Sequence, residues 1–225
     1  MLEMIFSAQF WVDVCTIIVI DLLLSGDNAV VIALACRNLP LEQRKKGILF
    51  GVGGAIGLRI LLTFFALNLL ALPFLKLIGS VLLLWIGVKL IVAEEENHDG
   101  HIQAGTNLWS AVKTILVADF VMSLDNVLGV AAAAKGNVPL LIFGLLVSIP
   151  LIAWSSQLVL KVIDRFPFII YAGGALLGYV AGEMLVGEAF IATLIEAQAY
   201  LHWLIPMLCA LLVLMFGEIL NRRNS

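Results

Sequence analysis

Charged residues are scarce in this chain. Lys, Arg, Asp and Glu make up 13% of its 225 residues, whereas a soluble domain carries about 25%. Hydrophobic residues reach 62%, and the mean hydropathy is +1.09. A water-soluble globule cannot hide so much apolar surface, so we predict an integral protein of the lipid bilayer. The formal net charge of −3 gives no basis for binding nucleic acid.

Cysteine is scarce too, and the usual patterns of enzymes are missing. Cys15, Cys36 and Cys209 stand alone in apolar runs without CxxC spacing, so we interpret them as small core residues rather than soft-metal ligands. No nucleophile–base pattern, phosphate loop or dinucleotide fingerprint occurs. We therefore expect no enzyme activity, no catalytic residues and no organic cofactor.

Long apolar segments dominate the sequence instead. A membrane-spanning helix needs about 20 mostly apolar residues. Their periodicity is that of helices buried all round, not of alternating barrel strands. We expect an all-α membrane protein with seven transmembrane helices, at about 10–36, 47–70, 74–93, 108–134, 138–161, 167–187 and 200–221.

The basic residues predict an orientation. Cytoplasmic loops of membrane proteins are enriched in Lys and Arg. The first loop, the fifth loop and the C-terminal tail would all be cytoplasmic if the N-terminus lies outside, and they hold Arg37, Arg44, Lys45, Lys46, Lys161, Arg165, Arg222 and Arg223. We therefore predict an N-terminus outside and a C-terminus in the cytoplasm.

A repeat relates the two halves of the chain. "DLLLSGDNAVVIA" from Asp21 returns as "DFVMSLDNVLGVA" from Asp119, 98 positions later. The copies lie in the first and fourth predicted spans, so each repeat unit has three spans. Because three is odd, the second unit would enter from the opposite side, which is an inverted repeat typical of transporters. We predict one three-helix unit at 1–93, an acidic cytoplasmic loop at 94–107, an inverted unit at 108–187, and an extracytoplasmic segment, extra helix and tail at 188–225.

The repeated motif places acids where charge is most costly. Each charge near the middle of a span costs at least about 3 kcal/mol, so the acids must be protonated, paired or wrapped around a cation. Carboxylate, amide and hydroxyl oxygens suit Mg²⁺, Ca²⁺ or Mn²⁺. The candidate metal ligands are Asp21, Asp27, Asn28, Asp119, Asp125 and Asn126, supported by Ser25 and Ser123.

Helical geometry separates these residues into two sets. Positions i, i+4 and i+7 share a face, which predicts a polar stripe from Asp21 through Ser25 to Asn28 and another in the second copy. Asp27 and Asp125 lie off the stripe and would join it only where the helix unwinds. Gly26 makes unwinding plausible in the first copy, while Leu124 in the second supports it less. An alternative is that the polar residues merely bond two helices together.

Arg59 is a further midplane charge. Its counterpart in the second unit is Ile152, so the arginine is unmatched. We expect Arg59 to pair with a motif carboxylate; the alternative is a bond to backbone carbonyls. The loop from Glu94 to His101 holds acids and histidines that suit metal collection, but we interpret it as a solvated loop because its sequence implies no chelating geometry.

The paired motifs in a seven-span chain resemble the TerC family, in particular its short YjbE-type members, and through it the LysE-like transporter superfamily. The resemblance covers essentially the whole chain. It implies a bacterial plasma-membrane protein that exports divalent metal, chiefly Mn²⁺, and supplies metal to exported proteins. The family name refers to tellurium resistance, which implies a less direct role.

Three functions therefore compete. The first is a secondary exporter of Mn²⁺ driven by proton antiport or membrane potential, with the bilayer, the metal ion and protons as partners. The second is a small-solute exporter like other LysE-like proteins, against which the four motif aspartates argue. The third is a non-transporting membrane factor in metal or tellurium stress. The sequence leaves the coupling ion open, and also whether the chain forms a homo-oligomer.

Overall fold

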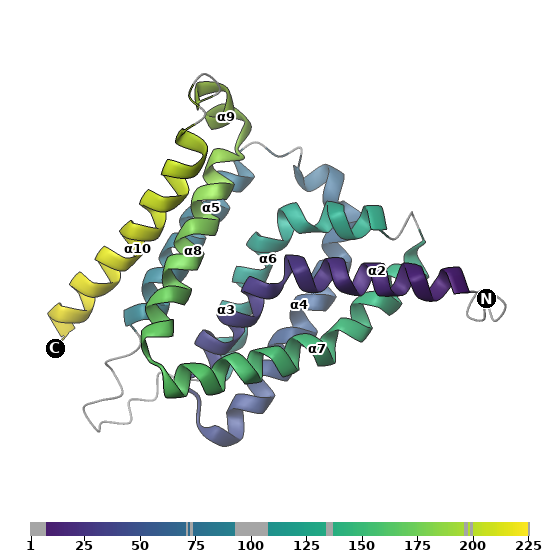
Figure 1. Cartoon of the computed structure of the whole chain (residues 1–225), viewed down its shortest axis with the longest axis horizontal. Helices are drawn as coiled ribbons and strands as arrows, with labels where there is room; N and C mark the ends of the chain where they lie inside the picture. Colours follow the sequence, from purple (N-terminus) through teal and green to yellow (C-terminus); the bar gives the residue numbers. More distant parts are fainter. Residues whose placement is uncertain are drawn as a thin grey trace.

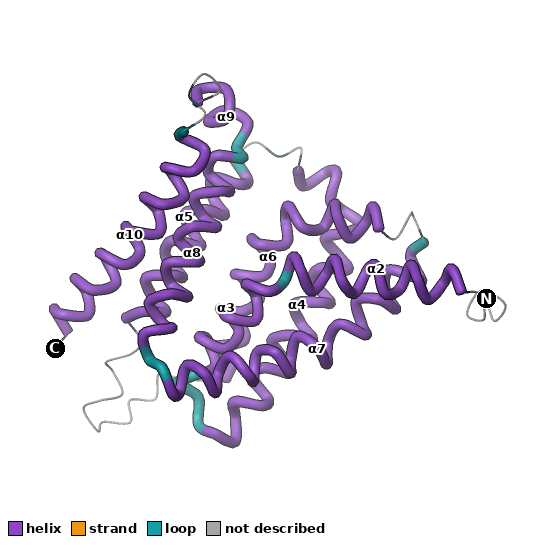
Figure 2. Tube along the Cα trace, in the orientation of Figure 1, coloured by secondary structure: helices purple, strands orange, loops and turns teal. Residues whose placement is uncertain are grey.

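The computed structural model describes residues 8–70, 72, 74–92, 108–133, 137–195, 198 and 200–224. Helices account for nearly all of these residues, and no strand occurs among them (Figure 2). The acidic loop predicted at 94–107, with His98 and His101, lies outside the described residues. The helices are α2 (Ala8–Leu24), α3 (Gly26–Cys36), α4 (Leu41–Leu70), α5 (Leu75–Val92), α6 (Leu108–Ala133), α7 (Val138–Arg165), α8 (Phe168–Val186), α9 (Ala189–Ile195) and α10 (Leu201–Asn224).

The helices form two packed groups (Figure 1). In one group, α5, α8 and α10 pack against one another. Gly178 and Gly182 of α8 face the backbone of Cys209 and Pro206 in α10, so the absence of a side chain lets these two helices approach closely. In the other group, α2, α3, α4, α6 and α7 surround the motif residues.

The predicted count of seven transmembrane helices is not confirmed. Five described helices are long and apolar enough to cross a membrane, namely α4, α5, α7, α8 and α10, and the bent pair α2–α3 makes a sixth if counted as one span. Helix α6 is not among these candidates. The described structure therefore supports an all-helical membrane protein with five to six candidate spans.

The first predicted span, 10–36, is broken in the middle. Helix α2 ends at Leu24 and α3 begins at Gly26, with a bend of 56° between them. Ser25 at the break has φ −117° and ψ 9°, outside helical geometry. A Cβ on Gly26 would meet nothing within 4 Å, so packing does not demand glycine there. Glycine lowers the intrinsic preference for continuing the helix, which favours a break at this position.

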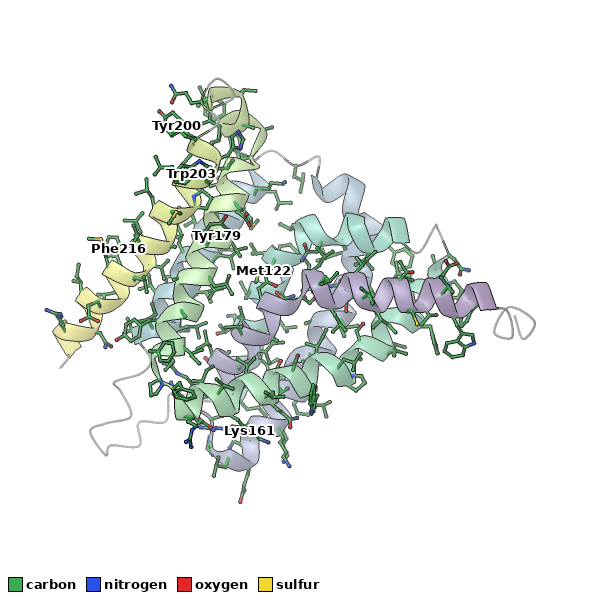
Figure 3. The ribbon with its side chains drawn as sticks, in the orientation of Figure 1. Met122, Lys161, Tyr179, Tyr200, Trp203 and Phe216 are labelled. Atoms are coloured by element: carbon green, nitrogen blue, oxygen red, sulfur yellow. The ribbon has the colours of Figure 1, made fainter. Side chains whose placement is uncertain are left out.

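The surface suits lipid rather than water. Large apolar side chains are exposed along the outer helices, including Trp85, Trp154 and Phe216. In Figure 3, Tyr200 and Trp203 lie near the upper end of α10, and Lys161 lies at the lower edge of the molecule. Aromatic residues and lysines are typical at the two boundaries of a membrane. The three cysteines are unpaired. Cys36 and Cys209 are buried as predicted, whereas Cys15 is exposed, so the prediction of a core residue is wrong for Cys15.

A candidate cation site where the motif helices meet

Arg59 in α4 joins the first aspartates of both motif copies. Its Nη1 donates to Asp21 Oδ1 in α2, and its Nη2 donates to Asp119 Oδ1 in α6 at 2.9 Å. The exposed fractions are 1% for Arg59, 0% for Asp21 and 5% for Asp119. Removing one partner of a buried ion pair costs about 3–5 kcal/mol, because the other charge loses its compensation. The predicted pairing of Arg59 with a motif carboxylate is confirmed, and it involves both copies.

The two motif serines complete this network in the same way. Ser25 Oγ accepts from Arg59 Nη1 at 2.6 Å and donates to Asp21 Oδ1 at 3.4 Å. Ser123 Oγ accepts from Arg59 Nε at 3.1 Å and donates to Asp119 Oδ2 at 3.3 Å. Each serine lies four positions after its aspartate, so both face the guanidinium. The predicted polar stripes are therefore present at these positions, and they face each other across the two helices.

The two motif asparagines behave differently. Asn28 Nδ2 donates across the interface to Asp119 Oδ1 at 2.9 Å. Asn126 Nδ2 donates instead to the backbone carbonyl of Leu24 at 2.8 Å. Leu24 is the last residue of α2, where a carbonyl lacks its usual partner within the helix. Sequence reasoning missed this contact, although the possible break at Gly26 was the signal that a carbonyl would need a donor.

The second aspartate of the first copy remains outside the network. Asp27 Oδ1 accepts from the backbone N–H of Asn28 at 2.9 Å, and Asp27 lies within electrostatic reach of Arg59 and Asp119. The helix breaks at the position where unwinding was considered plausible, and Asp27 bonds the backbone of α3 rather than Arg59. The reason is local: Asp27 lies in the first turn of α3, whose free N–H groups attract a carboxylate. Its role as a metal ligand stays a prediction. The side chain of Asp125 lies outside the described part, so its role stays a prediction.

Two buried oxygens in the network have no hydrogen-bond donor. They are Asp21 Oδ2 and Asn28 Oδ1, and the exposed fraction of Asn28 is 3%. Most buried polar groups in proteins are hydrogen-bonded, so two open acceptors near one ion triad mark the site as unusual. Asn28 and Asp119, with Val31, Ile32 and Ile115, also line a space too small for a water molecule.

The arrangement offers oxygens for a hard cation but is held by a guanidinium. Within the described residues, no three His, Cys, Asp or Glu side chains converge as metal ligands; the acids converge on Arg59 instead. The alternative that these polar groups merely bond helices together accounts for the serines and Asn126. It does not account for the open oxygens of Asp21 and Asn28.

Comparison with known proteins places the chain in a family. The profile of the integral membrane protein TerC family matches residues 6–225. The uncharacterized membrane protein YjbE of Bacillus subtilis (strain 168) is 40% identical over 207 residues, covering 92% of this chain and 94% of YjbE. YceF of the same organism, also an uncharacterized membrane protein, is 29% identical over 198 residues, covering 84% of this chain and 76% of YceF.

More distantly, the inner membrane protein YoaE of Escherichia coli (strain K12) is 24% identical over 207 residues, covering 84% of this chain and 40% of YoaE. No solved structure matches the chain. The family match spans nearly the whole sequence, both motif copies included, and the candidate spans agree with it. This chain is a multi-pass integral membrane protein that belongs to the TerC family.

Proposed function

We propose that this protein is a secondary transporter that exports divalent metal ions, preferentially Mn²⁺, across the bacterial inner membrane. The substrate site is formed by the motif residues Asp21, Asp27, Asn28, Asp119, Asp125 and Asn126, with Ser25, Ser123 and Arg59 in support. A single observation carries the proposal. Two buried aspartates from two different helices face each other, and the oxygens Asp21 Oδ2 and Asn28 Oδ1 beside them have no hydrogen-bond donor.

The ligand chemistry favours a hard divalent ion. Asp21, Asp119 and Asn28 present carboxylate and amide oxygens, which Mg²⁺, Ca²⁺ and Mn²⁺ all accept. Thiolate and imidazole are absent from both motif copies, and the single sulfur there is the thioether of Met122, so oxygen donors far outnumber soft ones. The preference for Mn²⁺ within the hard group comes from the resemblance to the TerC family, and metal competition in the experiment below tests it.

The packing supports the inverted repeat that such a transporter would use. A Cβ on Gly51 in α4 would lie 2.5 Å from Ile115 Cδ1 in α6, and a Cβ on Gly144 in α7 would lie 2.6 Å from Ile17 Cγ2 in α2. Gly51 and Gly144 are 93 positions apart, and Ile17 and Ile115 are 98 apart. One contact therefore recurs between equivalent positions with the two halves exchanged, as an inverted repeat requires.

Export also requires an orientation, and we propose an N-terminus outside and a C-terminus inside. In Figure 1 the α3–α4 turn, the α7–α8 junction and the end of α10 lie on the lower side, opposite α9. Arg44 donates to Asp164 Oδ2 at 2.8 Å, which joins two of the basic regions. In a variant with Cys15 replaced by serine, Arg222→Cys should react with an impermeant thiol reagent only after the cells are permeabilised.

Metal flux in proteoliposomes tests the function. Purified protein should carry Mn²⁺ across the membrane under an imposed pH gradient or membrane potential, and excess Mg²⁺ or Ca²⁺ should compete weakly. Asp21→Asn and Asp119→Asn should abolish the flux. Asp164→Asn is the matched control, because it makes the same chemical change at an acid outside both motif copies. The side chain of Asp164 is 47% exposed and pairs with Arg44.

Other results of the same flux experiment would favour one of the two competing functions. Flux of amino acids or another small solute without metal flux would indicate a LysE-like solute exporter. No flux of either kind from protein that is folded and correctly inserted would indicate a non-transporting factor. In both cases the metal-export proposal is wrong.

A further inference from the structure

Arg59 uses most of its hydrogen-bonding capacity on the candidate site. Nε, Nη1 and Nη2 each donate to a motif side chain, and together they contact Asp21, Ser25, Asp119 and Ser123. The fork of a guanidinium suits this simultaneous contact with two helices, whereas a lysine ammonium is a point charge. The guanidinium therefore stands where a cation bound between the two carboxylates would stand.

We propose that Arg59 is a tethered exchange cation: a substrate metal binds by displacing the guanidinium from Asp21 and Asp119, and the returning guanidinium releases the metal. This inference rests on the proposed metal transport and assigns the site an internal competitor. It requires that the metal and the guanidinium use the same oxygens in turn. No covalent or redox step is involved.

The contacts make simultaneous occupancy unfavourable. Asp119 Oδ1 already accepts from Arg59 Nη2 and from Asn28 Nδ2, both at 2.9 Å. The side chain of Arg59 is nearly fully buried, and the adjoining space does not admit a water molecule. A metal that took Asp119 Oδ1 as a ligand would place a second positive charge against the guanidinium, so the two cations repel each other at this distance.

Charge balance favours exchange with a divalent ion. Asp21 and Asp119 together carry a formal charge of −2, and the guanidinium compensates only half of it. A divalent metal compensates all of it, while a monovalent ion gains nothing over Arg59. Arg59 therefore weakens the binding of every cation, and it weakens that of monovalent ions most. Only a divalent ion neutralises more of the carboxylate charge than the guanidinium already does.

The open oxygens provide a starting point for the exchange. Asp21 Oδ2 and Asn28 Oδ1 are buried and lack donors, so they can take up the metal as the guanidinium withdraws from Asp21 Oδ1. The second half of the chain supplies no counterpart, since Ile152 in α7 stands at the equivalent position and is buried. One arginine from one half therefore serves both motif copies.

The test compares metal affinity with turnover in Arg59 variants. The metal binds only to those molecules in which Arg59 has moved away from the carboxylates. The smaller this fraction is, the weaker the apparent metal affinity. In Arg59→Gln, Mn²⁺ should therefore bind roughly tenfold more tightly or better, measured by calorimetry in detergent. Flux per molecule should fall at least about tenfold, because the metal is no longer displaced. Arg59→Lys, which keeps the charge but loses the fork, should lie between these values.

Thermal unfolding separates this role from a purely structural one. Without metal, Arg59→Gln should unfold at a lower temperature than the wild type, and Mn²⁺ should raise its unfolding temperature more than that of the wild type, because a ligand stabilises according to its affinity. Arg37→Gln is the matched control. It removes another buried guanidinium, which donates to the carbonyl of Leu90 at 2.9 Å, and it should leave Mn²⁺ affinity unchanged.

Failure of this inference is distinguishable from failure of the proposed function. If wild-type protein transports Mn²⁺ but Arg59→Gln and Arg59→Lys bind it equally or more weakly, Arg59 is a structural support and the exchange is wrong. If both variants bind more tightly yet turn over at the wild-type rate, the guanidinium does not release the metal and the exchange is again wrong. If wild-type protein neither binds nor carries Mn²⁺, the proposed function fails and this inference fails with it.

Discussion

The two copies of the motif share a sequence pattern but not a backbone. The first copy is broken, with α2 ending at Leu24 and α3 starting at Gly26 after a bend of 56°. The second copy lies within the continuous helix α6, where Leu124 replaces glycine and is buried. The shared aspartates and serines nevertheless meet the same guanidinium. Helix α6 thus presents its motif residues from a continuous helix, whereas α2 and α3 present theirs on either side of a bend.

The broken copy depends on the continuous one. The break leaves the carbonyl of Leu24 without a helical partner, and Asn126 from α6 donates to it. An unsatisfied carbonyl inside a membrane costs several kcal/mol, so the second copy stabilises the irregular backbone of the first. Asn28, the equivalent residue, instead contacts a side chain, Asp119. The two equivalent asparagines therefore differ in role: Asn126 stabilises the backbone at the break, and Asn28 contacts the candidate site.

The largest effect should come from removing either first aspartate. Asp21→Asn and Asp119→Asn each leave Arg59 with one carboxylate, which should destabilise the protein by about 3–5 kcal/mol in denaturant unfolding. Both variants should also lose Mn²⁺ flux. If one substitution is tolerated and the other is not, the two copies do not contribute equally to the site, and the shared-cation description is wrong.

A paired glycine substitution tests whether the two halves are equivalent in packing. Gly51→Ala and Gly144→Ala should each cost about 1–3 kcal/mol, because the added methyl overlaps Ile115 or Ile17. Both values are measured by thermal unfolding, and Gly144→Ala should cost more, because its methyl meets Ile17 Cγ2 and Cβ, whereas the methyl at Gly51 first meets the Cδ1 end of Ile115. Gly53→Ala is the control, since a Cβ there meets nothing within 4 Å, and it should be neutral or slightly stabilising. No cost at either position would contradict the contact that recurs between the two halves.

The dependence of the first copy on the second can be measured through Asn126. Asn126→Ala removes the donor to the Leu24 carbonyl and should cost about 1–3 kcal/mol. Hydrogen exchange should then increase selectively in the residues around the break. Asn28→Ala should leave that region protected and mainly reduce metal binding. Equal effects of both substitutions on exchange would show that the asparagines are not specialised.

The smallest effect on stability should come from substituting Gly26 at the bend between α2 and α3. Gly26→Ala fits without overlap and should change the free energy of unfolding by about 1 kcal/mol or less. It favours a continuous helix, so Mn²⁺ flux should fall more than stability changes. Unaltered flux would show that the bend at Ser25 is not needed for transport.

The apolar windows were sufficient to predict an all-helical membrane protein, but the predicted count of seven spans is not confirmed. Helical periodicity predicted the stripe from Asp21 through Ser25, and the unmatched charge of Arg59 predicted its pairing with a motif acid. These predictions succeeded because an uncompensated charge in a membrane is so costly that few partners are acceptable. The sequence also indicated Gly26 as the weak point of its helix.

Only the tertiary structure decided how these groups are shared. Arg59 serves both copies, and Asn126 donates to the carbonyl at the end of α2. Both contacts depend on how helices far apart in the chain pack together. Spacing along one helix specifies which side chains share a face, but not which face of another helix they meet. Residue types and local periodicity therefore determined the kind of site, while the packing of α2, α3, α4 and α6 determined which oxygens are held by Arg59 and which remain open.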